Sequence, residues 1–221
     1  MKLALFDLDN TLLPMDSDHG WSQFLIDLGV LDRAVFEARN DQFYADYKAG
    51  TLDIHAFLDF QFQPLKNNPR KTLDAWHAQY MEKVIGPNIR PSAIRLIEQH
   101  QNAGDVCVII TATNSFITTP IAQAFGIEHL IATEPEAMDG EFTGKVSGLP
   151  CFREGKVTRL NQWLQSQGWQ WSDVTASTFY SDSINDLPLL EQVSHPVAAN
   201  PDPTLAKIAQ TRQWPIIELF V

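Results

Sequence analysis

Two pairs of aspartates have a spacing that could serve chemistry. Asp7 and Asp9 close the first apolar run of the chain, and two residues apart at a strand end they can face the same crevice. Asp182 and Asp186 follow a later apolar run, with Asn185 between them. Carboxylates are the hard oxygen ligands that Mg²⁺ prefers. A turn or helix cap would account for one such acid, but poorly for the second pair with its asparagine. These acids therefore favour a magnesium site.

Two further positions could hold an anion. Thr111 ends the apolar run Val106–Ile110, where its hydroxyl and adjacent backbone N–H groups, that of Ala112 included, could hold phosphate oxygens. Lys156 follows Gly155 at the start of an expected helix, whose N-terminus also attracts anions. Alone, each could be an ordinary turn threonine or a solvated lysine. Together with the acids, they predict a site for a phosphate group.

The elements that must position these residues alternate between strand and helix. Apolar runs predict a strand just before each candidate, and helical periodicity fills the intervals. Such alternation with right-handed crossovers predicts an open parallel α/β sheet, which binds ligands beyond the carboxyl ends of its strands. The expected strands are 2–6, 105–111, 127–133 and 174–180, with short ones near Val197 and Ile216; the expected helices are 91–104, 121–125, 156–167 and 185–192, with a hairpin over 137–146.

The segment from about residue 16 to residue 86 interrupts this alternation with helical periodicity alone. Gly29 and Gly50 predict helix ends. Asp32 and Asn68 predict N-caps, the second followed by a proline at the first helical position. We expect three or four helices here, inserted directly after the first strand.

Together these residues resemble the four motifs of the haloacid dehalogenase superfamily. The matching residues are Asp7, Asp9 and Thr11 for the first motif, Thr111 for the second, Lys156 for the third, and Asp182 with Asp186 for the fourth. The helical insert between the first two motifs resembles the cap of the phosphoserine phosphatase branch. The resemblance implies a Rossmann-like core of residues 1–15 and 87–221, with a helical cap over residues 16–86.

The resemblance also implies a catalytic role for three residues. Asp7 would attack phosphorus and form an aspartyl phosphate. Asp9 would protonate the leaving alkoxide and then deprotonate the attacking water. Lys156 would balance charge on Asp7 and on the transferring group.

Metal and substrate ligands follow from the same resemblance. Mg²⁺ would be held by the Asp7 carboxylate, the Asp9 backbone carbonyl and Asp182, with Asp186 orienting this shell. The substrate-binding candidates are Thr111 and Ala112 for the phosphoryl oxygens, Lys156, Asn185 of the fourth motif, and Asp16, Asp18 and His19 near the first motif. Arg39 could meet a substrate carboxylate, but a solvated helix residue is the better interpretation for it.

Three departures from the family pattern keep the substrate open. Asp182 is flanked by Ser181 and Ser183 where the branch usually has glycines, and Asp16 stands where it has a glutamate. Ala112 and its successor, a threonine, replace glycines after the second motif. We therefore expect a phosphatase acting on a small phosphorylated metabolite such as phosphoserine or histidinol phosphate. Two alternatives are a phosphotransferase or mutase, and a non-enzymatic phospho-receiver module; the second acid of the first motif and the helical insert both argue against the module.

Composition limits the partners. The formal net charge of −11 and the pI near 4.8 disfavour nucleic acid and anionic lipid. Acids interrupt the first apolar run, so we expect no signal peptide, and no apolar stretch is long enough to span a membrane. Two cysteines without a CxxC pattern predict neither a zinc site nor a disulfide framework, and a cytoplasmic location follows. Monomer and dimer both stay open.

Overall fold

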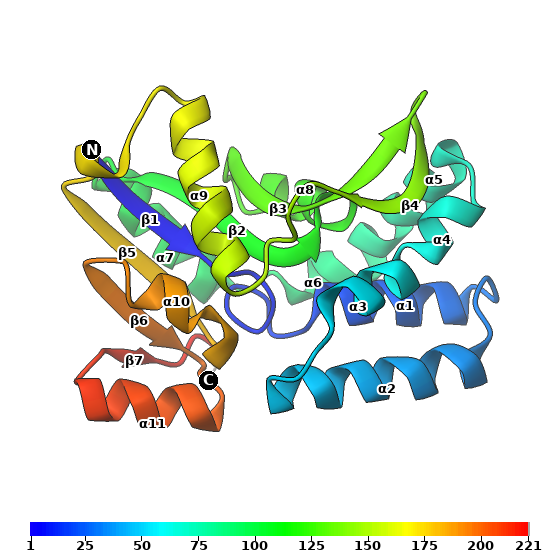
Figure 1. Cartoon of the computed structure of the whole chain (residues 1–221), viewed down its shortest axis with the longest axis horizontal. Helices are drawn as coiled ribbons and strands as arrows, with labels where there is room; N and C mark the ends of the chain where they lie inside the picture. Colours follow the sequence, from blue (N-terminus) through cyan, green and yellow to red (C-terminus); the bar gives the residue numbers. More distant parts are fainter. Residues whose placement is uncertain (221) are drawn as a thin grey trace.

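The computed structural model describes residues 1–220, apart from the side chain of Lys48, and is built on a seven-stranded sheet (Figure 1). The strand order is β4-β3-β2-β1-β5-β6-β7. Neighbouring strands are parallel except for the antiparallel pair of β3 and β4. The strands are β1 Lys2–Phe6, β2 Val106–Asn114, β3 His129–Met138, β4 Glu141–Ser147, β5 Ala176–Ser181, β6 His195–Ala199 and β7 Ile216–Ile217. The expected open, mainly parallel α/β sheet is confirmed.

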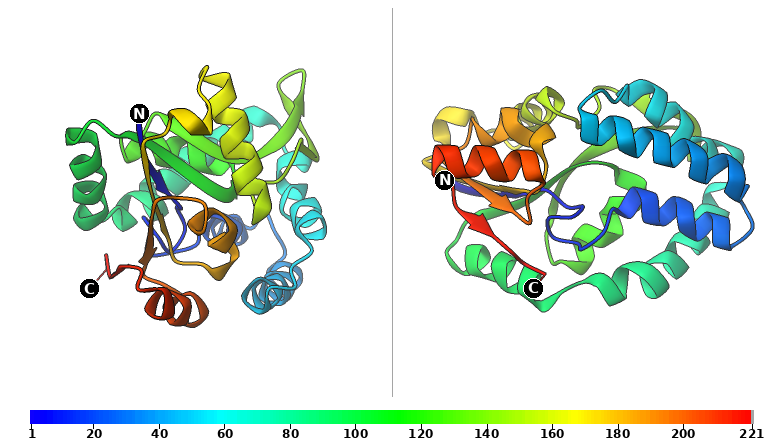
Figure 2. Two further views of the ribbon diagram at one scale, coloured as in Figure 1. Left: turned by 60° about the vertical axis from the view of Figure 1, so that its left-hand side comes forward. Right: turned by 90° about the horizontal axis from the view of Figure 1, so that it is seen from below.

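Helices cover both faces of the sheet, as the two views of Figure 2 show. Successive side chains of β1 point to opposite faces of the sheet, so the strand contributes to two separate hydrophobic cores. Leu3 and Leu5 are buried in a cluster that includes residues of α9, whereas Phe6 is buried in another that includes residues of α7. The helices of the sheet region are α7 Pro91–Asn102, α8 Ser115–Ala124, α9 Glu154–Ser166, α10 Leu187–Leu190 and α11 Pro203–Arg212, with 3₁₀ turns at Trp171–Asp173 and Ile184–Asp186.

The helical segment between β1 and β2 has more helices than the sequence predicted. Its elements are α1 Ser17–Asp27, α2 Arg33–Ala49, α3 Ile54–Gln61, α4 Gln63–Asn67, α5 Arg70–Tyr80, a π-helical turn at Met81–Ile85 and α6 Gly86–Asn88. The expectation of three or four helices was wrong because prolines divide the second half. Pro64 lies in the first turn of α4, where its missing N–H is tolerated. Asn68, the residue before Pro69, is extended and ends that helix.

The predicted helix ends were largely correct. The Asp32 carboxylate accepts a hydrogen bond from the N–H of Val35, and Gly50 ends α2 in the left-handed conformation with φ 72°. Asn68, however, does not cap α5. Its side chain donates to the Pro64 carbonyl instead, and Pro69 occupies the N-cap position. The expected helix over 185–192 was also too long, since only Leu187–Leu190 is α-helical after a 3₁₀ turn.

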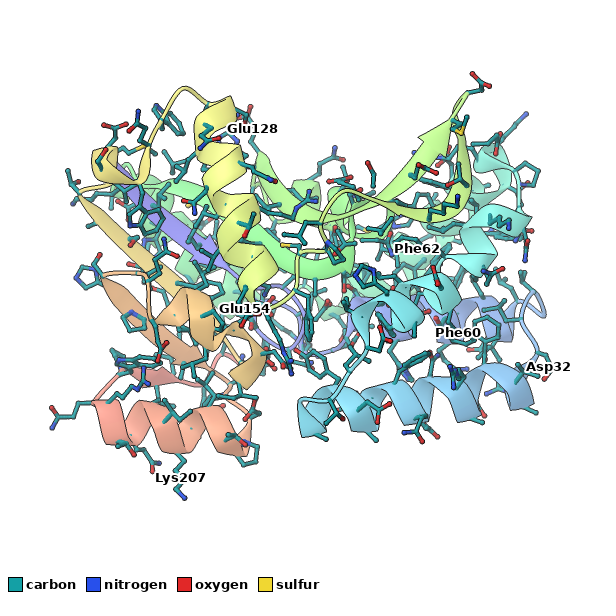
Figure 3. All side chains as sticks on the ribbon, viewed as in Figure 1. Asp32, Phe60, Phe62, Glu128, Glu154 and Lys207 are labelled. Carbon is teal, nitrogen blue, oxygen red and sulfur yellow. The ribbon has the colours of Figure 1, made fainter. Side chains whose placement is uncertain are left out.

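Helices α1 to α5 lie beyond the carboxyl ends of β1 and β2 in Figure 1. Aromatic side chains hold α2 and α3 together. The ring of Phe60, which is labelled in Figure 3, lies 4.5 Å from that of Phe36 and 5.6 Å from that of Phe43. The segment therefore stands over the edge of the sheet where a parallel fold places its ligands. Within residues 1–220, we find no helix with the length and hydropathy needed to cross a membrane.

Candidate active site

The first motif leaves β1 in a tight turn. The carbonyl of Leu8 accepts hydrogen bonds from the N–H groups of Thr11, Leu12 and Leu13. Asn10 adopts a left-handed conformation with φ 57°, which asparagine tolerates better than most residues. This turn keeps Asp7 and Asp9 at the end of the strand instead of letting them continue along the sheet.

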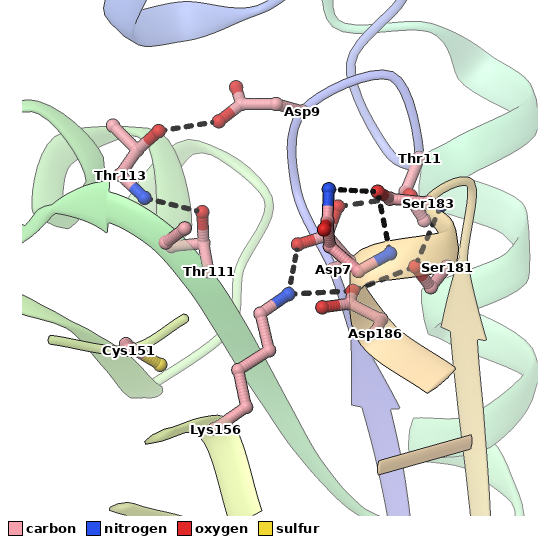
Figure 4. A network of polar contacts seen from close by, with 12 residues as sticks. Asp7, Asp9, Thr11, Thr111, Thr113, Cys151, Lys156, Ser181, Ser183 and Asp186 are labelled. Atoms are coloured by element: carbon pink, nitrogen blue, oxygen red, sulfur yellow. Dashed lines mark hydrogen bonds and ion pairs between the residues drawn. The ribbon is translucent and has the colours of Figure 1, made fainter. Parts of the chain in front are cut away.

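Lys156 links the first and fourth motifs. Its ammonium group lies 2.7 Å from Asp7 Oδ1 and 2.7 Å from Asp186 Oδ2 (Figure 4). Burial would lower the pKa of Lys156, but Asp186 and Asp7 outweigh it and raise that pKa. The ammonium therefore stays charged and neutralises part of the acid cluster.

A glycine allows Lys156 to reach this position. A Cβ atom at Gly155 would lie 2.2 Å from the carbonyl oxygen of Pro150, so only glycine fits against that backbone. Lys156 is the third residue of α9, which begins at Glu154, rather than the first residue of the helix as expected from the sequence.

Asp9 is held by two donors of different origin. The N–H of Ser17 donates to Oδ1 and the hydroxyl of Thr113 donates to Oδ2, each over 2.7 Å. Burial and the neighbouring carboxylates of Asp16 and Asp7 raise the pKa of Asp9 to about 7. A carboxyl group with a pKa near neutrality can both release and accept a proton in one catalytic cycle.

The carboxylates of Asp7 and Asp182 both contact the hydroxyl of Thr11. Asp7 Oδ2 and Asp182 Oδ1 each lie 3.2 Å from the Thr11 Oγ1 atom, whose single hydrogen can serve one of them at a time. Burial raises the pKa of Asp7 to about 6. The positive charge of Lys156 opposes this increase, and the negative charge of Asp186 adds to it. Burial, Asp7 and Asp186 raise the pKa of Asp182 well above its usual range.

This acid pair fits a divalent cation. Within the described part of the chain, no three side chains of histidine, cysteine, aspartate or glutamate form a complete metal site. Mg²⁺, however, commonly takes only one or two carboxylates and fills its shell with other oxygens. Asp7 and Asp182 offer two carboxylates whose mutual repulsion one lysine does not remove.

Thr111 and Thr113 lie near the end of β2, which continues to Asn114 and so is longer than the predicted strand. The Thr111 Oγ1 atom accepts a hydrogen bond of 3.2 Å from the Thr113 N–H, which leaves the Thr111 hydroxyl hydrogen for another acceptor. Register with β3 shifts between Ile110 and Asn114, so this stretch departs from regular pairing. Thr111 and Ala112 both line the central cavity.

This central cavity lies between the motifs and the helical segment. Its acidic end carries the catalytic candidates, and aromatic and aliphatic side chains of α2, α3 and the loop between them form much of the rest. The described lining residues are Asp7, Asp9, Asn10, Asp16, Asp18, His19, Asn40, Phe43, Tyr44, Tyr47, Leu52, Ile54, Phe57, Gln61, Thr111, Ala112, Thr113, Phe152, Lys156 and Asp186. Of these, only Lys156 and His19 have basic side chains.

Contacts between the helical segment and the sheet region close one side of the cavity. The Tyr47 hydroxyl donates a hydrogen bond of 2.8 Å to Ser183 Oγ. Asn185 accepts from Arg153 Nε over 3.0 Å, and its amide reaches the Tyr47 carbonyl at 3.4 Å. Arg153 also donates to the carbonyl of Gly50.

The structure therefore brings most of the predicted residues together, with some differences. Asp16 lines the cavity, but its carboxylate also caps α1 by accepting from the N–H groups of Asp18 and His19. Asn185 lies at the contact between the helical segment and the sheet region and is not among the lining residues. Arg39 is exposed, and its guanidinium lies 4.6 Å above the Phe43 ring.

Several residues of the site were not predicted from the sequence. Thr113 could have been found, because it lies two residues after Thr111 and such residues share one face of a strand. Asn40 and Gln61 lie on different helices and are joined by a 3.3 Å hydrogen bond. No local sequence pattern predicts that these two side chains lie together in the cavity.

Comparison with known proteins agrees with this geometry. The model of the haloacid dehalogenase-like hydrolase family matches residues 4–191. A histidinol-phosphatase of Neisseria meningitidis serogroup C is 48% identical over 217 residues, which cover 98% of each chain.

Two solved structures extend this comparison. A protein of unknown function from Bordetella pertussis Tohama I is 50% identical, with a TM-score of 0.94 and 99% of each chain covered. A phosphoserine phosphatase, solved as an analogue of its phospho-aspartyl intermediate, has a TM-score of 0.67 at 20% identity, over 98% of this chain and 92% of its own. The second likeness concerns the fold. The chain thus belongs to the haloacid dehalogenase-like hydrolases and is a phosphatase with the fold of the phosphoserine phosphatases.

Proposed function

We propose that this phosphatase hydrolyses the phosphomonoester of a cationic amino alcohol, L-histidinol phosphate, with Mg²⁺ and through an aspartyl phosphate on Asp7. The composition of the central cavity carries this proposal. Carboxylates of Asp16 and Asp18 suit an ammonium group, and Phe43 and Phe57 offer faces for a planar ring. The amides of Asn40 and Gln61 could hydrogen-bond ring nitrogens.

Phosphoserine fits the same cavity less well. It carries a carboxylate, and a buried charge needs an opposite charge or strong hydrogen bonds. Among the described lining residues, Lys156 is already in contact with Asp7 and Asp186, and the other basic side chain is the exposed His19. L-Histidinol phosphate has no carboxylate, and the name of the Neisseria relative agrees with this choice.

The proposed reaction has two displacements. In the first, a carboxylate oxygen of Asp7 forms a bond to phosphorus while the ester P–O bond breaks, and Asp9 gives its proton to the leaving alkoxide. In the second, Asp9 takes a proton from water, whose oxygen bonds to phosphorus and releases Asp7 and inorganic phosphate. The pKa of Asp9 near 7 suits both transfers.

Other residues of the site support these steps. The Thr111 hydroxyl and the backbone N–H of Ala112 can donate to phosphoryl oxygens. Lys156 holds Asp7 in place over 2.7 Å and offsets negative charge as the phosphate arrives. Asp7, Asp182 and the backbone carbonyl of Asp9 would hold Mg²⁺, which lets an anionic nucleophile approach an anionic ester.

The helical segment is placed to close the cavity, and the cysteines bear on the cellular location. Tyr47 and Asn185 join the helical segment to the sheet region beside the cavity, and we propose that this segment is a cap that excludes bulk water during turnover. Cys107 and Cys151 are free and buried, in keeping with a reducing cytoplasm.

A substrate panel tests the proposal. Phosphate release with saturating Mg²⁺ is measured for L-histidinol phosphate, phosphoserine and an aryl phosphate, with Asp7→Asn as the control for contaminating phosphatases. We expect kcat/KM for L-histidinol phosphate to exceed that for phosphoserine by about 100-fold, the scale at which an unpaired buried group discriminates. Equal or greater kcat/KM for phosphoserine would overturn the assignment.

A further inference from the structure

Asp18 is a buried acid in the cavity that takes no part in the two displacements at phosphorus proposed above. It lies in the first turn of α1 and is 7% exposed, yet it lines the central cavity beside the catalytic acids. The residue belongs to none of the four motifs, and its carboxylate neither caps α1 nor contacts Lys156.

The carboxylate of Asp18 is poorly satisfied by the protein. Among the described residues it receives one hydrogen bond, a long one of 3.5 Å from the Asn114 amide, and it forms no ion pair. Buried carboxylates are normally paired with a positive charge or with several donors. Burial, reinforced by Asp16 and Asp9, raises its pKa well above the usual range. Among the described residues, the protein itself therefore places no positively charged side chain in contact with this carboxylate.

Asn114 fixes the direction of this group. Its Oδ1 atom accepts from the N–H of Ile117 at the start of α8, so its amide nitrogen is turned toward Asp18 Oδ1. The other carboxylate oxygen of Asp18 has no hydrogen-bond partner in the described part of the chain. An arriving ammonium group could donate to it.

We propose that Asp18 is the specificity-determining residue that binds the ammonium group of the substrate. The proposal rests on the proposed function in one respect, namely that the substrate is an amino alcohol phosphate. An ammonium would bring the missing positive charge to Asp18, while the phosphate end of the molecule lies against Asp7 and Thr111. A substrate without an amino group would leave Asp18 buried and unpaired, and would bind less well.

The test compares two substrates that differ only in the amino group. L-Histidinol phosphate and its deamino analogue, imidazolylpropyl phosphate, are assayed with the parent, with Asp18→Asn and with Asp41→Asn. Asp41 is an exposed acid of α2 outside the cavity, so its variant makes the same charge change away from the site. We expect the kcat/KM of the parent to be about 100-fold higher for L-histidinol phosphate than for the deamino analogue, mostly through a lower KM. The deamino analogue cannot form the charged pair with Asp18 in the buried site.

In Asp18→Asn this preference should fall to within about 3-fold, because the variant lacks the carboxylate that would pair with the ammonium group. Asp41→Asn should keep the parental ratio. Thermal unfolding of each variant checks that it is folded. If Asp18→Asn is not folded, the comparison is made with Asp18→Ser in its place.

Two outcomes would overturn the role of Asp18: a parent enzyme that does not distinguish amine from deamino substrate, or a variant that keeps the parental preference. Failure of the proposed function looks different. If L-histidinol phosphate is not hydrolysed but another amino alcohol phosphate is, the same comparison is made with that compound and its deamino analogue. Loss of its amine preference in Asp18→Asn then supports Asp18 although the histidinol assignment has failed.

Discussion

The hydroxyl of Thr113 donates a 2.7 Å hydrogen bond to Asp9 Oδ2, across 104 residues of sequence. With the Ser17 N–H on the other oxygen, it fixes the rotation of the carboxyl group that we assign as acid and base. We predict that Thr113→Val lowers kcat about 10-fold with little change in KM, since a hydrogen bond to a charged group contributes about 1.5–3 kcal/mol. Thr113→Ser, which keeps the hydroxyl, should restore most of the rate. Steady-state kinetics of both variants check this, and a serine variant as slow as the valine variant would make the contact incidental.

Asp7→Asn should abolish turnover and leave the fold intact. The amide cannot attack phosphorus, but it nearly matches the carboxylate in shape. Phosphate release is compared for variant and parent at saturating Mg²⁺, and circular dichroism confirms the fold. Near-parental activity would remove Asp7 from the mechanism.

Asp9→Asn should slow alkyl phosphates more than aryl phosphates. A well-placed acid–base group contributes about 10²–10⁴-fold, and an aryl leaving group needs less protonation than an alkoxide. The measurement is single-turnover hydrolysis of one alkyl and one aryl phosphate by variant and parent. Equal losses on both substrates would argue against proton donation by Asp9.

Removal of divalent metal should stop the reaction reversibly. The carboxylates of the buried Asp7 and the partly buried Asp182 both contact the Thr11 hydroxyl, and we propose that Mg²⁺ binds between them. Activity is followed in excess chelator and after return of Mg²⁺, with Asp182→Asn expected to need a higher Mg²⁺ concentration for half-maximal rate. Undiminished turnover in chelator would contradict this metal assignment.

The charge of Asp18 should also appear in the dependence of stability on pH. Its pKa is raised in the folded state, so the folded protein holds this proton more tightly than the unfolded chain does. The stability that this provides is fully present below the unfolded pKa and is lost as pH rises through the folded pKa. Asp18→Asn cannot ionise, so its melting temperature minus that of the parent should increase between about pH 4 and about pH 8.

Melting of parent and variant in chelator, without substrate, measures this difference. Asp41→Asn is again the control, because its acid is exposed. A difference that stays constant or shrinks as pH rises would mean that Asp18 is not a buried, unpaired charge.

The sequence by itself determined the sheet and the residues at its edge. Apolar runs ending in Asp7, Thr111 and Asp182 predicted parallel strands, and parallel strands bring their carboxyl ends to one edge. Lys156 was predicted at a helix start after glycine, and the structure places it in the first turn of α9, as the third residue of that helix. The predicted sheet and the proximity of these residues at one edge agree with the structure, because hydrophobic periodicity and the position of a residue at a strand end are local properties of the chain.

Tertiary structure alone decided how the helical segment meets that edge. Tyr47 contacts Ser183 across 136 residues, and Asn40 meets Gln61 from another helix. Asp18 was predicted only as one of several polar candidates, and its burial beside Asn114 depends on packing of α1 against α8. Helical periodicity gives the buried face of a helix but neither its rotation nor its distance from a distant strand, because many crossing geometries bury the same apolar face. Packing of the whole chain chooses among them, and with that choice it sets which side chains the substrate meets.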